Sequence, residues 1–159
     1  MLCYKSIELN DKIYYICVII DIFSRKVIAY KISLKSSTQL ITTTFKKAYI
    51  DRGAPHGTIF HSDRGSQYTA QAFRKLLNDR NIIQSFSKSG HPHDNAVAES
   101  FFSTLRKEEL FRMRYRSERE FYKGLEDYIE FYNDKRPHST IRYITPNKFE
   151  ALYMEKQSY

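Results

Sequence analysis

Two carboxylates in this sequence stand where an oxygen-rich metal site could form. Asp63 follows an apolar, strand-like run at residues 57–60, and Glu99 lies in a later helix-like segment, with thirty-five residues, 64–98, between them. A carboxylate at a strand end and a second on a facing helix form a hard oxygen site suited to Mg²⁺ or Mn²⁺. Such a site can activate water or a sugar hydroxyl against a phosphodiester. The pair therefore indicates metal-dependent phosphoryl transfer.

Each carboxylate also has a simpler interpretation. Asp63 before Arg64-Gly65 is typical of a turn in which the carboxylate bonds nearby backbone N–H groups and Gly65 takes a positive φ. Glu99 alone is typical of a first-turn helix glutamate, which suits the helix dipole. If the helix starts near Asn95, however, an apolar set and a polar set of side chains form adjoining ridges along it. The apolar set is Phe101, Phe102 and Leu105, and the polar set is Glu99, Ser103 and Arg106. This pattern predicts that Glu99 is held near the sheet.

The composition indicates a polyanionic partner. The chain has 159 residues, 42% of them hydrophobic, which fits one domain with a real core. Its 26 Lys and Arg against 18 Asp and Glu give a formal charge of +8. Nucleic acid is favoured over a membrane, because no apolar run approaches spanning length, and a solvated basic surface is the alternative. Cys3 and Cys17 are too few for a disulfide framework and no signal peptide is visible, so a reducing cytoplasm is the simplest compartment.

The order of the predicted elements indicates a mixed-sheet α/β domain. Strands are predicted at residues 2–9, 13–20 and 26–33, with a turn at Asn10-Asp11. A helix capped by Ser36 or Ser37 follows and ends at residues 53–55. A strand into Asp63, a helix from about Thr69, a strand at 82–85 and the helix of Glu99 come next. Strands in hairpins first, then strands alternating with helices, are typical of a mixed sheet.

The carboxyl-terminal part is predicted to be helical and basic. Beyond residue 110, Arg112, Arg114 and Arg116 occupy alternate positions, and residues 117–120 form a capping box that opens a helix. One face of that helix carries Phe121, Leu125, Tyr128, Ile129 and Tyr132. Burial explains this spacing fully, so the stripe is predicted to be core packing rather than a platform for stacked bases. Thr145-Pro146 is predicted to begin a last short helix.

A polar loop at residues 87–95 joins the last predicted strand to the helix of Glu99. Lys88, His91 and His93 could contact DNA phosphates, and a purely structural loop is an equal alternative. Zinc is disfavoured, because no Cys or third His lies at usable spacing and nearby carboxylates prefer hard ions.

Several of these motifs, taken in order, resemble one protein family. They are His61-Ser-Asp-Arg-Gly-Ser-Gln-Tyr68, Glu99 after its thirty-five-residue gap, and Phe131-Tyr-Asn-Asp-Lys-Arg-Pro-His138. Together they resemble the integrase-type catalytic core of bacterial insertion-sequence transposases, an Asp-Asp-Glu class related to retroviral integrases. The resemblance covers residues 13–149. It implies a ribonuclease-H-like mixed sheet flanked by helices, with a catalytic core at 1–110 and a helical extension of the same domain at 111–159.

The resemblance also implies an activity and its partners. Asp63 and Glu99 would be catalytic and bind Mg²⁺ or Mn²⁺ during transfer of a 3′-hydroxyl DNA end into target DNA. The predicted DNA-binding residues are Lys88, His91, His93, Asn95, Arg106 and Lys107. The partners would be transposon ends and target DNA, and the active form would be a homo-oligomer. The protein would act in the bacterial cytoplasm and bind no membrane. A separate protein or an upstream domain would supply a helix-turn-helix. A non-catalytic nucleic-acid-binding remnant and a nuclease of the same fold are the alternatives.

The third carboxylate of that class has no obvious counterpart in this sequence. In the family, the first catalytic Asp lies on the strand before the phrase that Asp21-Ile22-Phe23-Ser24-Arg25 resembles, and the Asp of this phrase is non-catalytic. The first carboxylate is therefore expected near Leu2 or before Met1, and the chain is expected to be truncated at its amino end. Asp21 as a substitute third ligand is the competing interpretation.

Overall fold

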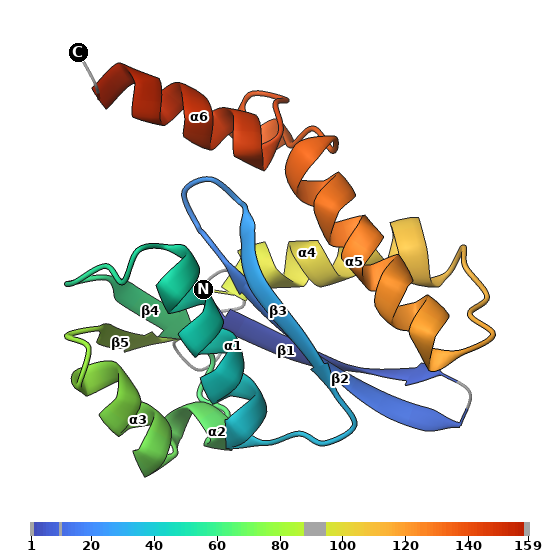
Figure 1. Ribbon diagram of the computed structural model, residues 1–159, viewed down its shortest axis with the longest axis horizontal. Helices are drawn as coiled ribbons and strands as arrows, with labels where there is room; N and C mark the ends of the chain where they lie inside the picture. Colours follow the sequence, from blue (N-terminus) through green and yellow to red (C-terminus); the bar gives the residue numbers. More distant parts are fainter. Residues whose placement is uncertain (1, 10, 88–94, 158–159) are drawn as a thin grey trace. The chain divides into compact units, whose positions relative to one another are not determined.

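The computed structural model describes residues 2–9, 11–87 and 95–157, and Figure 1 shows its helices and strands. The chain forms two compact units. The first unit is Met1–Ile20 with Ile28–Glu99, and the second is Asp21–Val27 with Ser100–Tyr159. The predicted division at residue 110 stays a prediction.

A β-hairpin begins the first unit, as predicted. Strand β1 (Leu2–Leu9) pairs antiparallel with β2 (Lys12–Ile20), in a register that runs from Leu2↔Ile19 to Leu9↔Lys12. Asp11, in the turn, has a φ of 58°, a left-handed conformation that Asp tolerates. All five residues at positions 16–20 are buried, so the second half of β2 is covered on both faces. Strand β3 (Val27–Ser33) is at the edge of this three-stranded sheet, as its alternating pattern predicted.

The helices of the first unit pack around an aromatic cluster. Helix α1 (Thr38–Asp51) begins at Ser37, whose Oγ accepts a hydrogen bond from the Leu40 N–H at 3.2 Å. It is followed by β4 (Ile59–Ser62), the short helices α2 (Ser66–Thr69) and α3 (Gln71–Asn78), and β5 (Ile83–Phe86). The rings of Phe45, Phe60 and Phe73 contact one another with centroid separations of 5.4–5.9 Å. This cluster joins α1, β4 and α3 in one core.

Parallel and antiparallel pairing both occur in the first unit. β4 pairs parallel with β5 from Ile59↔Ile83 to Ser62↔Phe86, and β4 also contacts β1. The mixed pairing and the interleaved helices confirm the predicted α/β class.

The second unit is mostly helical. Helix α4 (Ala96–Leu105) begins in the first unit and continues in the second into a wider π-helical turn, η2 (Arg106–Leu110), in which the Phe111 N–H donates to the Arg106 carbonyl at 2.9 Å. Helix α5 (Glu118–Asp134), a 3₁₀ turn η3 (Ser139–Ile141) and helix α6 (Pro146–Gln157) follow. Along the part of the chain that the structure describes, no helix combines the length and apolar character needed to cross a membrane.

Helix α5 confirms the predicted cap and core stripe, with one difference. Ser117 Oγ accepts from the Glu120 N–H at 3.2 Å, but the Glu120 carboxylate accepts from the Arg116 N–H at 2.7 Å rather than from that of Ser117. The capping box is therefore shifted by one residue on one side. All members of the predicted stripe are buried: Phe121, Leu125, Tyr128, Ile129 and Tyr132.

The turn that follows β2 contacts the carboxyl-terminal helices within the second unit. The Asn133 side chain accepts from the Val27 N–H at 2.9 Å and donates to the Val27 carbonyl at 3.0 Å, as a neighbouring strand would. Ser24 Oγ donates to Glu150 at 2.7 Å, and the Phe23 ring lies 5.0 Å from that of Phe149. The 21–25 phrase therefore packs against α6, and the 131–138 phrase bonds Val27.

We expect Asn133→Ala to destabilise the protein by about 2–4 kcal/mol, because two buried backbone groups of Val27 lose their partner. Denaturant unfolding measures the change. Asn78→Ala, at the exposed end of α3, is the control and should shift stability by less than about 0.5 kcal/mol. Equal stability of the two variants would show that the hydrogen bonds between Asn133 and Val27 do not stabilise the protein.

Candidate active site

Asp63 is the first residue beyond β4, as predicted. It is half-buried, and its Oδ1 accepts a hydrogen bond from the Gly65 N–H at 2.8 Å. This contact confirms the turn that the simpler interpretation predicted. The same hydrogen bond orients the carboxylate through Oδ1. Among the described residues, Oδ2 makes no hydrogen bond.

Gly65 has a different role from the one predicted. Its φ is −55° and its ψ is 146°, so the expected positive φ is wrong. A Cβ at this position would lie 3.0 Å from Asp63 Oδ1 and 3.2 Å from Gln67 Oε1, closer than most real Cβ contacts. Glycine avoids this crowding against the Asp63 carboxylate, and a sequence pattern does not show such crowding.

His61 ties the ends of β4 and β5 together beside Asp63. Its Nδ1 lies 3.1 Å from Ser85 Oγ, and its Nε2 lies 3.1 Å from Ser87 Oγ. The Ser87 N–H also donates to the Ser62 carbonyl at 2.9 Å. Sequence reasoning missed this bridge, although two serines at alternate positions opposite a histidine are its signal.

Glu99 lies in the first turn of α4 and is exposed, so the prediction that its carboxylate is held near the sheet rather than in open water is wrong. The predicted ridges are confirmed: Phe101, Phe102 and Leu105 are at most 1% exposed, Ser103 is exposed and Arg106 is half-buried. Glu99 and Asp63 belong to the same compact unit. Their convergence on one metal ion stays a prediction.

The predicted DNA-binding residues are only partly described. Lys88, His91 and His93 lie outside the described residues. Asn95 is half-buried immediately before α4, and Arg106 and Lys107 are adjacent on η2, half-buried and exposed. The structure therefore gives positions for three of the six residues without testing their role.

The described carboxylates fit Mg²⁺ or Mn²⁺ by donor type. Within the described ranges, no group of three or more His, Cys, Asp or Glu side chains is arranged to hold a metal ion. Mg²⁺ is commonly held by one or two carboxylates together with water and substrate phosphates, so a pair is a usable set. Asp21 Oδ1 accepts from the N–H groups of Phe23 and Ser24, at 2.8 and 3.3 Å, which gives Asp21 a turn-forming role.

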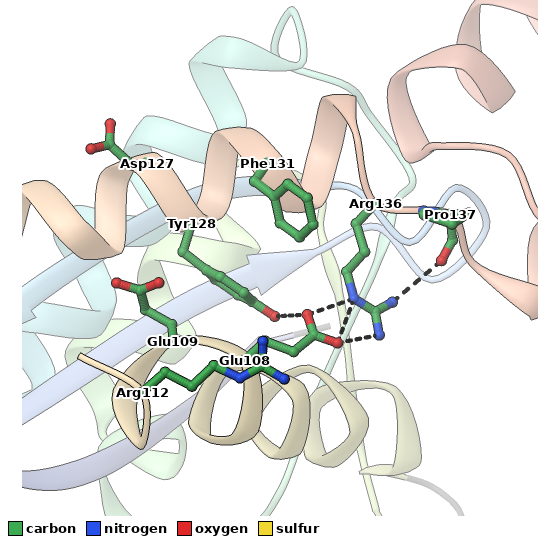
Figure 2. A pocket seen from close by; sticks show the side chains of 8 residues that line it. All are labelled: Glu108, Glu109, Arg112, Asp127, Tyr128, Phe131, Arg136 and Pro137. Carbon is green, nitrogen blue, oxygen red and sulfur yellow. Dashed lines mark hydrogen bonds and ion pairs between the residues drawn. The ribbon is translucent and has the colours of Figure 1, made fainter.

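An ion pair in the second unit was not predicted. Glu108 and Arg136 line a groove of about 560 Å³. Arg136 binds Glu108 with two nitrogens, the Nη2–Oε1 and Nε–Oε2 distances both being 2.8 Å, and Figure 2 shows the two side chains pointing toward each other. Tyr128 OH donates to the same carboxylate at 3.1 Å. The hydrogen bonds from Arg136 lower the pKa of Glu108, and burial raises the pKa of Tyr128. The partners are twenty-eight residues apart, so no local pattern connects them.

Comparison with known families identifies the chain. A model of the integrase core domain matches residues 3–92, and a second model of the same description matches residues 80–146. The chain belongs to the integrase core domain family and matches transposases of bacterial insertion sequences, as the sequence motifs indicated.

Relatives are longer proteins. The transposase for insertion sequence element IS904 of Lactococcus lactis subsp. lactis (strain IL1403) is 36% identical over 140 residues, which are 86% of this chain and 54% of that protein. The transposase InsF for insertion sequence IS3A of Escherichia coli (strain K12) is 34% identical over 137 residues, 86% of this chain and 48% of that protein. A Lactococcus lactis protein named as an ATP-dependent protease is 40% identical over 113 residues, 70% of this chain and 36% of that protein. The chain spans about half the length of the transposases that it matches.

Solved structures show the fold. The simian T-cell lymphotropic virus intasome gives a TM-score of 0.78 at 15% identity, covering 93% of this chain and 52% of that chain. The HTLV-2 integrase catalytic core domain in complex with magnesium gives 0.68 at 15% identity, covering 91% of this chain and 89% of that chain. These matches confirm the ribonuclease-H-like fold of retroviral integrase cores, followed by helices.

We expect Gly65→Ala to lower the free energy of unfolding by about 1–2 kcal/mol, because the added methyl group crowds the Asp63 carboxylate. Gly53→Asn is the control: Gly53 has a φ of 70°, which Asn tolerates, and nothing lies within 4 Å of its Cβ position. Thermal and denaturant unfolding measure both. A Gly65→Ala variant as stable as the wild type would show that Asp63 is not crowded.

We expect the stability difference between the wild type and Glu108→Gln to depend on pH. A carboxyl whose pKa is lower in the folded state stabilises the protein above its unfolded pKa, and this contribution disappears as the pH falls through the folded pKa. The wild type should therefore be the more stable near neutral pH, and the difference should shrink in acid. Glu130→Gln, exposed on α5, is the control for loss of a charge. A difference that stays constant from neutral pH into acid would contradict the ion pair.

Proposed function

We propose that this chain is the catalytic core of a transposase, in which Asp63 and Glu99 act together in metal-dependent transfer of a 3′-hydroxyl DNA end into target DNA. The observation that supports this most strongly is a carboxylate oriented by the backbone directly beyond β4, in the same compact unit as a glutamate in the first turn of α4. Membership of the integrase core family supplies the reaction class. Because the chain spans about half of its transposase relatives, the activity of a whole transposase is part of the proposal.

Asp63 and Glu99 would hold Mg²⁺ or Mn²⁺, and DNA phosphate oxygens and water would complete the shell. The bound ion would supply positive charge to the phosphate oxygens and orient the attacking hydroxyl. A magnesium complex of the HTLV-2 integrase core, which has this fold, supports the choice of ion.

The other residues of the site would position the Asp63 carboxylate and neutralise the DNA phosphates. The Gly65 N–H fixes Asp63 Oδ1, and His61 with its two serines holds the strand ends from which Asp63 projects. Correct placement and electrostatic stabilisation account for most of the catalysis of phosphoryl transfer, so these contacts bear directly on the rate. Lys88, His91, His93, Asn95, Arg106 and Lys107 would contact DNA, and a homo-oligomer would assemble on transposon ends.

Asp21 is not a ligand in this proposal. Its carboxylate accepts two backbone N–H groups of its own turn. An asparagine oxygen can accept the same bonds, so Asp21→Asn should preserve the turn while removing the charge.

We expect Mn²⁺ to bind this chain more tightly when duplex DNA is present, because the phosphates add ligands to the two carboxylates. Asp63→Asn and Glu99→Gln should each weaken Mn²⁺ binding about tenfold or more, whereas Asp21→Asn should leave it unchanged. The electron paramagnetic resonance signal of free Mn²⁺, titrated with and without DNA, measures binding. A joining assay with a 3′-hydroxyl DNA end and a target duplex measures the reaction.

The outcomes separate the candidate functions. An activity that is lost in Asp63→Asn and Glu99→Gln depends on the two carboxylates. Its product then distinguishes the candidates: joined DNA indicates a transferase, and cleaved DNA alone indicates a nuclease. DNA binding without any Mn²⁺ binding that depends on these carboxylates would favour a non-catalytic nucleic-acid-binding module. Loss of Mn²⁺ binding in Asp21→Asn would show that Asp21 is the third ligand and that the assignment of the motif is wrong.

A further inference from the structure

The connection between η2 and α5 exposes arginines at alternate positions. Arg112, Arg114 and Arg116 are exposed, whereas Tyr115 is only 7% exposed. The N–H groups of Arg112 and Met113 both donate to the Glu109 carbonyl, so Arg112 lies in the turn that ends η2. Arg114 and Arg116 are exposed on either side of the buried Tyr115. The segment is neither helix nor strand, and its side chains are available to a partner.

Tyr115 fixes this segment to the second unit. Its OH donates to Glu109 Oε1 at 2.5 Å, and its ring lies 5.4 Å from that of Phe121. A Cβ on Gly124 would lie 2.6 Å from Tyr115 Cε1, so only glycine leaves room for this ring. The arginines are therefore presented from an anchored backbone, which reduces the entropy lost on binding.

The neighbouring acidic groups are already engaged within the second unit. Glu108 is bound by Arg136, Glu109 by Tyr115, and Glu120 by the Arg116 N–H. In the described part of the chain, by contrast, the guanidinium groups of Arg112, Arg114 and Arg116 make no hydrogen bond or ion pair. Arg112 lies near enough to Glu108 to help lower the pKa of that carboxyl, and Figure 2 shows it along the same groove.

We propose that Arg112, Arg114 and Arg116 form a phosphate-binding strip for duplex DNA, an inference that rests on the proposed function and adds a second DNA contact to it. Each DNA strand presents a phosphate about every 3.4 Å, so a short segment that carries three guanidinium groups faces several phosphates at once. Arginine suits this partner because its planar fork binds phosphate oxygens in pairs.

DNA fits this surface better than a membrane does. Phe111 and Met113 are also exposed, at 78% and 52%, and could enter a lipid headgroup region. Membrane-surface segments present a continuous apolar face along an amphipathic helix, however, and residues 111–117 are not helical. Anionic vesicles are therefore the competing probe.

The test compares two triple variants of the whole chain. Arg112→Gln/Arg114→Gln/Arg116→Gln removes the strip, and Arg142→Gln/Lys148→Gln/Lys156→Gln removes the same charge from exposed positions elsewhere in the second unit. Binding to a random-sequence duplex is measured over a range of salt concentrations. We expect the first variant to bind at least tenfold more weakly at low salt and to flatten the slope of log affinity against log salt by up to about 2.7, since each phosphate contact contributes about 0.9. A third variant with lysine at the three positions should keep most of the slope, and thermal unfolding should match the wild type.

The outcomes distinguish this proposal from the function on which it rests. Equal loss of affinity and slope in both glutamine variants would overturn the strip, whereas Mn²⁺ binding at Asp63 and Glu99 would still report on the proposed function. Binding to phosphatidylserine vesicles that depends on the arginines, without a change in DNA binding, would overturn it in favour of a membrane. A wild type that binds no DNA at any salt concentration would overturn both.

Discussion

The direction of one carboxylate depends on the pairing of two four-residue strands. β4 and β5 are too short for their backbone hydrogen bonds alone to fix a position, and side chains on both faces add what is missing. On one face Phe60 inserts into the cluster with Phe45 and Phe73. On the other face, at alternate positions, lie His61 and Asp63, the first bonded to β5 and the second to Gly65. Core packing and a polar bridge thus hold the same strand end in place, and this restricts the position of the Asp63 carboxylate.

In the second unit, side chains form hydrogen bonds with buried polar groups where the chain turns. Asn133 bonds both backbone groups of Val27, and Arg136 binds Glu108 at the end of α5. His138 is buried against Tyr132, with ring centroids 4.4 Å apart, and burial lowers its pKa, which favours the neutral ring. The phrase that helped to indicate the family is therefore a packing device in this structure. Its hydrogen-bonded partner is Val27, at the start of β3, so two segments far apart in sequence depend on each other.

Local signals predicted most of the elements. Ser37 and Ser117 cap helices where expected, and the stripe from Phe121 to Tyr132 is buried, because capping and helical periodicity act over a few residues. The π-helical turn was not predicted, since a bond from Phe111 to Arg106 leaves no clear mark on the pattern.

Long-range contacts account for what the sequence did not show. Glu108 finds Arg136, and His61 finds two serines, only after the chain has folded. The sequence pattern predicted a positive φ at Gly65, whereas the structure shows a glycine beside a crowding carboxylate. Such crowding depends on side-chain positions rather than on turn type. In the candidate site, residue types and spacing selected Asp63 and Glu99, whereas the groups that orient Asp63 came from the structure.

The carboxylates of the candidate site and the arginines of the second unit are linked through the negative charge of DNA. Asp63, Glu99 and a DNA phosphate are all negative, so they approach one another only if cations offset the repulsion. A divalent ion can do so at the carboxylates, but it acts over a short range and leaves most of the DNA uncompensated. In the second unit Arg136 binds Glu108 and Tyr115 donates to Glu109. The guanidinium groups of Arg112, Arg114 and Arg116, by contrast, make no internal ion pair among the described residues. An internal ion pair such as Glu108–Arg136 removes one positive and one negative charge together, so it leaves the formal charge of +8 unchanged. What the pairing decides is where cations without an internal ion pair remain, and among the described residues of this unit Arg112, Arg114 and Arg116 are such cations.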